Sequence, residues 1–141
     1  LNMQLIEMDG RLYAIGGLND NYVKTKTVEM YDPKTDQWSW KKKTNYERGN
    51  SGATAYNGSI YLLSDKGFEM YSPKTDEWSI LPSPSEKPFD TVLLSVGTEL
   101  WALGGSDSAA VDSYNTDTRK WTRRPDMDVK RTDHTGFILY Q

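Results

Sequence analysis

The sequence has 141 residues, of which 17 are basic and 20 acidic, so its net charge at neutral pH is −3, and 36% of its residues are hydrophobic. A chain of this size and composition is typical of one soluble globular domain. The acidic balance argues against a nucleic-acid partner, and no apolar run approaches the roughly 18 residues that cross a membrane. Cysteine is absent, which excludes disulfides, thiolate metal sites and a cysteine nucleophile.

The chain begins with two predicted strands on either side of Asp9-Gly10. Asp-Gly supplies the positive φ values that a two-residue hairpin turn needs. A second predicted hairpin follows in "VEMYDPKTDQW" (28–38), where hydrophobic and polar residues alternate before the turn. Asp32-Pro33 suits the opening of a type I turn. The first part of the chain is therefore expected to form four short strands.

The same order of strands recurs twice. The second copy reads "ATAYNGSIYLL" (53–63) and then "EMYSPKTDEW" (69–78), and the third reads "VGTELWALGG" (96–105) and then "DSYNTDTRKW" (112–121). No window shows helical periodicity. In each copy a Tyr precedes a Trp by seven residues, and the pairs are Tyr31 and Trp38, Tyr71 and Trp78, and Tyr114 and Trp121.

Three copies of a four-stranded unit, with the tyrosines 40 and then 43 residues apart, are typical of β-propeller blades. The large Tyr and Trp rings can pack between neighbouring sheets, where they bury much apolar area. The glycine pairs Gly16-Gly17 and Gly104-Gly105 follow the second strand of their units and permit a backbone path closed to residues with a Cβ. The sequence therefore predicts an all-β fold of antiparallel blades.

The combination of a glycine pair with a Tyr and a Trp seven residues apart resembles the kelch-repeat family, and the resemblance covers essentially the whole chain. The segment "PDMDVKRTDH" (125–134) also resembles the linker between kelch blades, in which an Arg is followed three residues later by a His. The second repeat departs from the family pattern, because Ser64-Asp65 stands where the glycine pair belongs. The resemblance implies a kelch-type β-propeller.

The predicted blades and the extra strand divide the chain into four parts, at about 3–40, 51–80, 90–123 and, for the extra innermost strand, 134–140. Because a propeller ring typically needs four to eight blades, we expect part of a five- to seven-bladed propeller in a BTB–kelch type protein. The alternative is that two copies of the chain meet in a ring of about six blades. The first residue is Leu1 and not methionine, which also favours a piece of a longer chain.

The sequence offers little for catalysis. His134 is the only histidine, and we expect it to be an inner-strand residue, because its neighbour Asp133 points to the opposite face of a strand and cannot orient it as a base. Asp126, Asp128 and the "NDN" segment (19–21) lack the spaced oxygen ligands of a calcium loop. We therefore expect no enzymatic activity, no metal and no cofactor.

The resemblance implies a function in protein–protein recognition, because many kelch proteins are substrate receptors of cullin-based ubiquitin ligases through an amino-terminal BTB domain. In such members a short peptide or loop of the target is held by the loops between second and third strands and by the linkers between blades. Here these segments are about 18–27, 64–67 and 106–111, and about 41–50, 81–90 and 122–133. We expect a cytoplasmic protein of this kind, and the alternative is a structural, actin-associated kelch protein.

The candidate partner-binding residues carry the aromatic, basic and polar side chains typical of interface anchors, and they are Tyr22, Asn21, Lys24, Tyr46, Arg48, Asn50, Arg131 and Asp133. Arg48 and Arg131 fall at the same place, just before an innermost strand. Their guanidinium groups either hold a partner carboxylate bidentately or contact the backbone or an acid of a neighbouring blade. Because two of the linkers are basic, we expect an acidic partner segment.

Overall fold

The computed structural model describes residues 3–86 and 88–131, and this part of the chain forms twelve β-strands. They build three four-stranded antiparallel sheets, which confirms the predicted all-β fold of four-stranded units. The first sheet contains β1 (Met3–Met8), β2 (Arg11–Gly16), β3 (Val28–Asp32) and β4 (Gln37–Lys41); the second contains β5 (Gly52–Tyr56), β6 (Ser59–Ser64), β7 (Gly67–Ser72) and β8 (Glu77–Leu81); the third contains β9 (Val92–Val96), β10 (Glu99–Leu103), β11 (Val111–Asn115) and β12 (Lys120–Arg124). The extra strand predicted at 134–140, with His134, lies outside the described residues.

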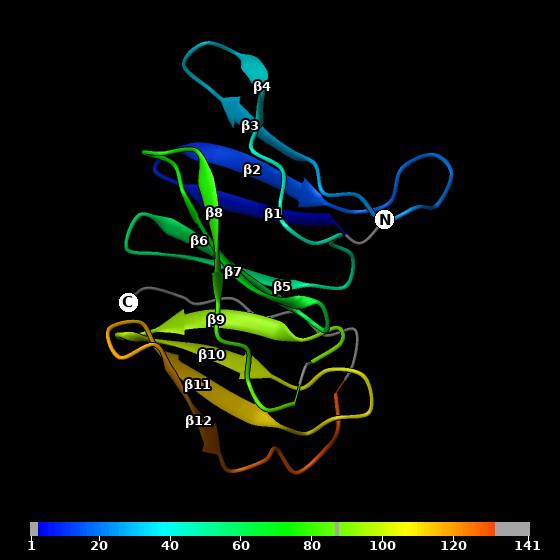
Figure 1. The fold of residues 1–141 in the computed structure, drawn as a ribbon, viewed down its shortest axis with the longest axis vertical. Coiled ribbons are helices and arrows are strands. Elements are labelled where there is room, and N and C mark those ends of the chain that lie inside the picture. The colour runs from blue at the N-terminus through cyan, green and yellow to red at the C-terminus, as the bar shows by residue number, and fades with distance from the viewer. Residues whose placement is uncertain (1–2, 87, 132–141) are drawn as a thin grey trace.

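The three sheets follow one another along the long axis of the molecule (Figure 1). In each sheet the strands lie in chain order, so that consecutive strands are hydrogen-bonded neighbours. The innermost strands of the sheets meet, with β5 in contact with both β1 and β9. The outer strands β4, β8 and β12 therefore lie at the opposite side of their sheets, as in the blades of a propeller.

Local residue chemistry sets the tight turns. Asp9 and Gly10 have φ values of 53° and 75°, and Asn57 and Gly58 have φ values of 48° and 74°. Both residues of each turn therefore adopt the left-handed conformation that a type I′ hairpin requires. The longer turn between β3 and β4 ends on Asp36, whose φ is 54°. Asp and Asn tolerate this conformation better than other residues with a Cβ, so the sequence specifies these turns.

Buried aromatic rings join neighbouring sheets. The ring of Tyr71 in the second sheet lies 5.9 Å from that of Tyr13 in the first, and the ring of Phe68 in the second lies 4.8 Å from that of Tyr114 in the third, both edge to face. All four side chains are at most 3% exposed. Two hydrophobic clusters surround these contacts, with Met8, Ile15, Val28, Ile60 and Leu62 in the first and Leu63, Leu81, Leu93, Leu100 and Ala102 in the second. The core therefore lies between the sheets.

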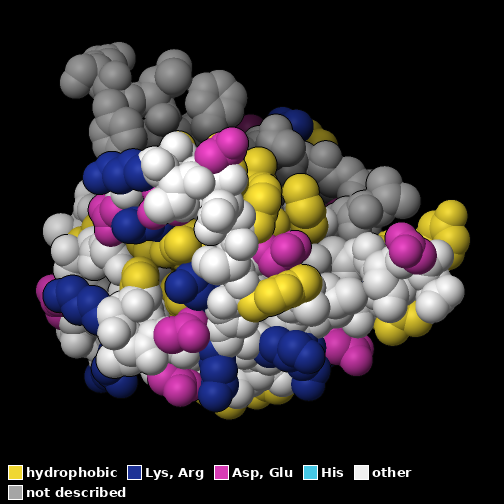
Figure 2. Space-filling view, turned by 90° about the horizontal axis from the view of Figure 1, so that it is seen from above, with side chains coloured by type: hydrophobic (Ala, Val, Ile, Leu, Met, Phe, Trp, Pro, Cys, Tyr) yellow, Lys and Arg dark blue, Asp and Glu magenta, His cyan; other side chains and the backbone are white. Residues whose placement is uncertain are grey.

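The tryptophans of the three repeats differ in burial. The indole Nε1 of Trp78 donates a hydrogen bond of 2.9 Å to the carbonyl of Lys42, and that of Trp121 donates one of 2.7 Å to the carbonyl of Pro82. Trp38 occupies the equivalent place in the first sheet but is 52% exposed, because no sheet precedes it among the described residues. Figure 2 looks onto this end of the molecule and shows hydrophobic side chains at its surface. The Trp38 ring therefore packs on Tyr31 of its own sheet, with the two ring centroids 5.3 Å apart, and its outer face is open.

Removal of the Phe68 ring should destabilise the junction of the second and third sheets. Phe68 is fully buried and contacts the rings of Tyr114 and Trp121. We expect Phe68→Ala to lower the free energy of unfolding by about 3–5 kcal/mol, measured by urea denaturation. The matched control is Trp40→Ala, which removes a ring that is 69% exposed and should change stability by less than about 1 kcal/mol. Equal losses in the two variants would contradict a core between the sheets.

Candidate protein-interaction face

Six connecting segments lie along one edge of the three sheets, at the right of Figure 1. Because strand directions alternate, the loop after the second strand of a sheet and the linker that leaves its fourth strand emerge at the same edge. We call this edge the loop edge. It consists of the β2–β3, β6–β7 and β10–β11 loops, the first linker (42–51), the second linker (82–91) and the third linker (125–131).

Backbone hydrogen bonds fix the first linker against the β2–β3 loop. The amide of Gly17 donates to the carbonyl of Arg48 at 2.7 Å, and the amide of Arg48 donates to the carbonyl of Thr25 at 2.9 Å. A Cβ on Gly16 would overlap the carbonyl oxygen of Arg48, so the glycine pair is needed for this close approach.

The third linker repeats this arrangement on the β10–β11 loop. The amide of Gly105 donates to the carbonyl of Arg131 at 3.0 Å, and the amide of Arg131 donates to the carbonyl of Ser108 at 3.1 Å. Arg48 and Arg131 therefore hold equivalent backbone positions, each clasped between a glycine and a residue of the preceding sheet's loop.

The side chain of Arg48 points into the protein and is only 1% exposed. Its Nη2 and Nε donate to Oε2 of Glu69 at 2.6 and 3.1 Å, and its Nη1 donates to Ser64 Oγ at 2.6 Å and to the carbonyl of Gly67 at 2.9 Å. Burial lowers the pKa of the Arg48 guanidinium, and the hydrogen bond and charge of Glu69 oppose that shift. The structure thus corrects the expectation that Arg48 offers its guanidinium to a partner. The alternative, contact with an acid of the neighbouring blade, is the arrangement found.

The departure of the second repeat from the glycine pair now has a reason. Ser64 stands at the place of the first glycine, and its hydroxyl accepts one of the Arg48 hydrogen bonds. The other carboxylate oxygen of Glu69 also has hydrogen-bond partners, since its Oε1 accepts hydrogen bonds from the backbone amide and the side-chain amide of Asn45, at 2.8 and 2.7 Å. The ring of Tyr46 covers the guanidinium, with Arg48 Cζ at 5.5 Å from its centroid. Tyr46 is therefore partly engaged in holding Arg48.

Tyr22 is the most exposed large hydrophobic side chain reported for the described residues, at 78%. Its loop is nevertheless fixed, because Oδ1 of Asn19 accepts the amides of Asn21 and Val23 at 3.0 Å each, and the carbonyl of Asn19 accepts the amide of Tyr22 at 2.9 Å. Tyr22 has a φ of 59°, a conformation uncommon for an aromatic residue. The loop therefore holds an aromatic ring in the solvent.

The remaining predicted residues are spread along the loop edge. The ammonium of Lys24 lies 5.3 Å from the ring centroid of Phe89, which brings the β2–β3 loop next to the second linker. Asn50 adopts a φ of 57° and its carbonyl accepts the amide of Asp90 at 3.1 Å. Arg131 is exposed, and Asp133 lies outside the described residues. The structure thus brings Tyr46 to Arg48 and Lys24 to the second linker.

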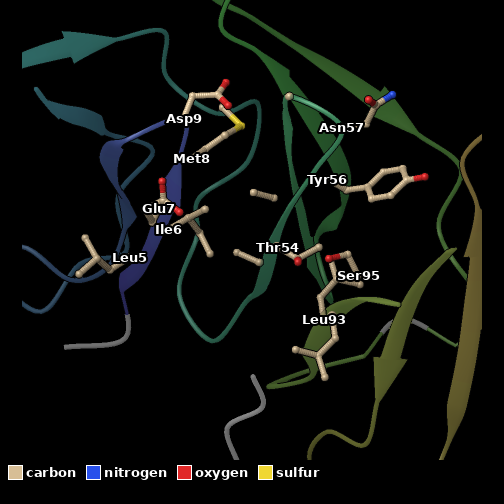
Figure 3. Close-up of a pocket in the computed structure, with 14 residues that line it drawn as sticks. Leu5, Ile6, Glu7, Met8, Asp9, Thr54, Tyr56, Asn57, Leu93 and Ser95 are labelled. Atoms are coloured by element: carbon tan, nitrogen blue, oxygen red, sulfur yellow. The ribbon is translucent and has the colours of Figure 1, made fainter. Parts of the chain in front are cut away.

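Two of the cavities in the described part of the chain are lined by none of the predicted partner-binding residues. One, of about 410 Å³, lies between the innermost strands β1, β5 and β9 and is lined by apolar side chains such as Leu93 together with polar ones such as Thr54 and Glu7 (Figure 3). The other, of about 280 Å³, lies on the loop edge between the second linker and the third sheet, and Pro88 and Asp112 are among its lining residues. We call the second one the Asp112 cavity. The sequence analysis did not predict the Asp112 cavity, although the regular spacing of the linkers shows which of their residues hold equivalent positions.

Comparison with known proteins agrees with this architecture. A family model described as the Kelch motif matches residues 4–39. The chain belongs to the kelch-repeat family. Kelch-like protein 35 from Mus musculus is 30% identical over 142 residues, which cover 94% of this chain and 24% of the relative. Kelch-like protein 36 from Bos taurus is 26% identical over 143 residues, which cover 87% and 23%.

This kelch chain thus spans about a quarter of the length of the two Kelch-like relatives. A solved structure, that of YjhT, superimposes with a TM-score of 0.76 over 90% of this chain and 52% of its own, at 17% identity, which shows a shared fold. Within residues 3–86 and 88–131 of the kelch chain, no group of three or more His, Cys, Asp or Glu side chains could hold a metal ion. The same residues include no helix of the length and apolarity that a membrane crossing requires.

The buried ion pair makes a prediction about the stability of the kelch chain. Arg48→Met would leave the Glu69 carboxylate buried without a cation, and we expect the free energy of unfolding to fall by about 3–5 kcal/mol in urea denaturation. The double variant Arg48→Met/Glu69→Leu removes both charges and should recover much of this loss. The control Arg131→Met alters an exposed arginine and should cost about 0.5 kcal/mol or less. A loss no larger for Arg48→Met than for Arg131→Met would contradict the structural role.

Proposed function

We propose that this kelch chain recognises a protein partner by holding a short peptide or loop of it against the loop edge. The observation that supports this most directly is that hydrogen bonds hold the segments of the loop edge in place while the side chain of Tyr22 on one of them is exposed. Backbone hydrogen bonds and the buried Arg48–Glu69 pair hold the first linker, while Tyr22 is 78% exposed on a loop that Asn19 fixes. Rigid loops bind without a large loss of conformational entropy, and tyrosine is a favoured interface anchor.

In this proposal the chain belongs to a cytoplasmic substrate receptor of a cullin-based ubiquitin ligase, of the BTB–kelch type. The resemblance of the sequence to kelch proteins supports this role by analogy. Further blades would complete a ring of five to seven, and the face of the first sheet with the half-exposed Trp38 fits a neighbouring blade. The role is one of binding, without a cofactor or a catalytic step.

The charge of the partner segment is a separate part of the proposal. The two basic linkers predict an acidic partner segment, but of their two equivalent arginines Arg48 is committed to Glu69. Arg131 remains exposed on the third linker, where its backbone is held by Gly105 and Ser108. A carboxylate of the partner would therefore meet Arg131 and not Arg48.

Affinity capture with the full-length protein tests this function. We expect Tyr22→Ala and Arg131→Ala each to reduce partner recovery about tenfold, because interface anchors contribute more than 1 kcal/mol each. The matched control is Val96→Ala, which removes a side chain that is 50% exposed at the end of β9, beside the β9–β10 turn and at the edge of the sheet opposite to the loop edge. The thermal midpoint of all three variants should stay near that of the wild type.

The captured partners decide between the two functional classes. Recovery of cullin subunits together with a Tyr22-dependent protein would support the adaptor role. Recovery of actin or associated proteins would support the structural alternative instead. Capture that is unaffected by Tyr22→Ala and Arg131→Ala would show that the loop edge is not the binding face.

A further inference from the structure

The second linker differs from the first at one decisive position. Pro88 lies four residues before Val92, the first residue of β9, just as Arg48 lies four residues before Gly52, the first residue of β5. The register is confirmed by the residue two positions later, since Asn50 and Asp90 both have positive φ values, of 57° and 65°. The second linker thus carries a proline where the first carries the arginine that fills the sheet junction.

The acid that receives the arginine is nevertheless retained. Asp112 lies two residues before the buried Tyr114, as Glu69 lies two residues before the buried Tyr71. The strand pairing is also equivalent, because the two tyrosines face corresponding residues of the neighbouring strands β10 and β6. The third sheet therefore keeps a carboxylate at the position of Glu69, although the second linker, which leads into this sheet, has no arginine at the position of Arg48.

The Asp112 cavity occupies the space that corresponds to the Arg48 guanidinium. Each ligand of Arg48 in the second sheet has its counterpart in the cavity lining: Ser64 corresponds to Gly104, Gly67 to Ala110, and Glu69 to Asp112. Gly104 has no side chain where Ser64 has one, which leaves more room. The cavity measures about 280 Å³ and opens on the loop edge.

The electrostatics of the cavity favour a cation. The Asp112 side chain is 11% exposed, and its Oδ2 lies 3.7 Å from Nη1 of Arg123, beyond hydrogen-bond distance. Arg123 makes its shorter contact, of 2.8 Å, with Asp126. Burial raises the pKa of Asp112, with a smaller opposing effect of Arg123. Two further acids, Glu86 and Asp107, also line the cavity. Arg123 lies 3.8 Å from Glu86 and Lys130 lies 2.9 Å from Asp107, so these two exposed cations are shared among four acids, Asp112 and Asp126 included, and the balance around the cavity stays negative.

We propose that the Asp112 cavity binds the guanidinium group of an arginine side chain supplied by the protein partner. The internal precedent is the Arg48 site, where a guanidinium rests on the corresponding carboxylate and carbonyl. A planar guanidinium suits this geometry better than an ammonium, since it donates several hydrogen bonds in one plane. The inference rests on the proposed function only in that the arginine comes from a partner protein bound at the loop edge.

A small-molecule titration tests the cavity without the partner. The ¹⁵N-labelled chain is titrated with N-acetyl-L-arginine amide, and N-acetyl-L-citrulline amide serves as the neutral probe of the same shape. We expect saturable shifts of the backbone amides of Ala102, Ser106 and Asp112, with binding at least about tenfold weaker for the citrulline probe. The lysine analogue should also bind more weakly than arginine. Equal binding of the arginine and citrulline probes, or no shift at these amides, would overturn the proposal.

Two pairs of variants give an independent test. Asp112→Asn keeps the shape of the side chain and should abolish the arginine-dependent shifts, while Asp117→Asn, in the exposed turn after β11, should leave them unchanged. Pro88→Arg should place an internal guanidinium in the cavity, so that it blocks the probe and raises the thermal midpoint above that of Pro88→Ala. Pro88→Ala should still bind the probe. Probe binding that survives in both Asp112→Asn and Pro88→Arg would overturn the assignment.

The outcome is separable from that of the proposed function. If Tyr22→Ala loses partner capture and the cavity does not bind arginine, the loop edge is supported as the interaction face and the arginine site is contradicted. Arginine binding at the cavity without any Tyr22-dependent partner would keep the cavity and remove the proposed face.

Discussion

The buried contact between Arg48 and Glu69 decides where the first linker lies, and the loop edge depends on that placement. Taking both charges out of water costs several kcal/mol per ion, so such a pair persists only when its polar atoms are satisfied. Here four hydrogen bonds leave the guanidinium, and both amide groups of Asn45 bind the other oxygen of Glu69. Because a shift of the linker would break several of these bonds at once, the pair fixes geometry more than it adds stability.

Around this contact the three repeats share their backbone and differ in their side chains. Positions between sheets are constrained, since a buried ring such as Tyr71 or Tyr114 has no room to change. Packing constrains the linkers less, and their sequences differ between repeats, so that Pro88 in the second linker takes the place of Arg48 in the first. The third sheet keeps an acid, Asp112, at the position of Glu69. The junction of the first and second sheets is therefore filled by the Arg48 side chain, whereas the junction of the second and third sheets contains an open acidic cavity.

The proposed sites together would suit a partner segment of mixed charge. A carboxylate suits the exposed Arg131, an arginine suits the Asp112 cavity, and an apolar group suits the ring of Tyr22. All three belong to the loop edge, which backbone hydrogen bonds and buried sheet contacts hold in place. Kelch repeats are suited to such a role because packing fixes their sheets while their connecting segments can vary.

The sequence by itself determined the strands, the turns and the number of sheets. Asp9-Gly10 and Asn57-Gly58 specify hairpins through their own backbone preferences, and the repeated Tyr and Trp mark equivalent strands. It also identified Arg48 and Arg131 as equivalent, since spacing along the chain is enough for that. Only the tertiary structure decided that the Arg48 side chain turns inward to Glu69, that Trp38 is half exposed, and that Asp112 lines a cavity. The physical reason is that burial and charge pairing depend on which sheet packs against which, and a residue's own sequence neighbours do not determine that contact.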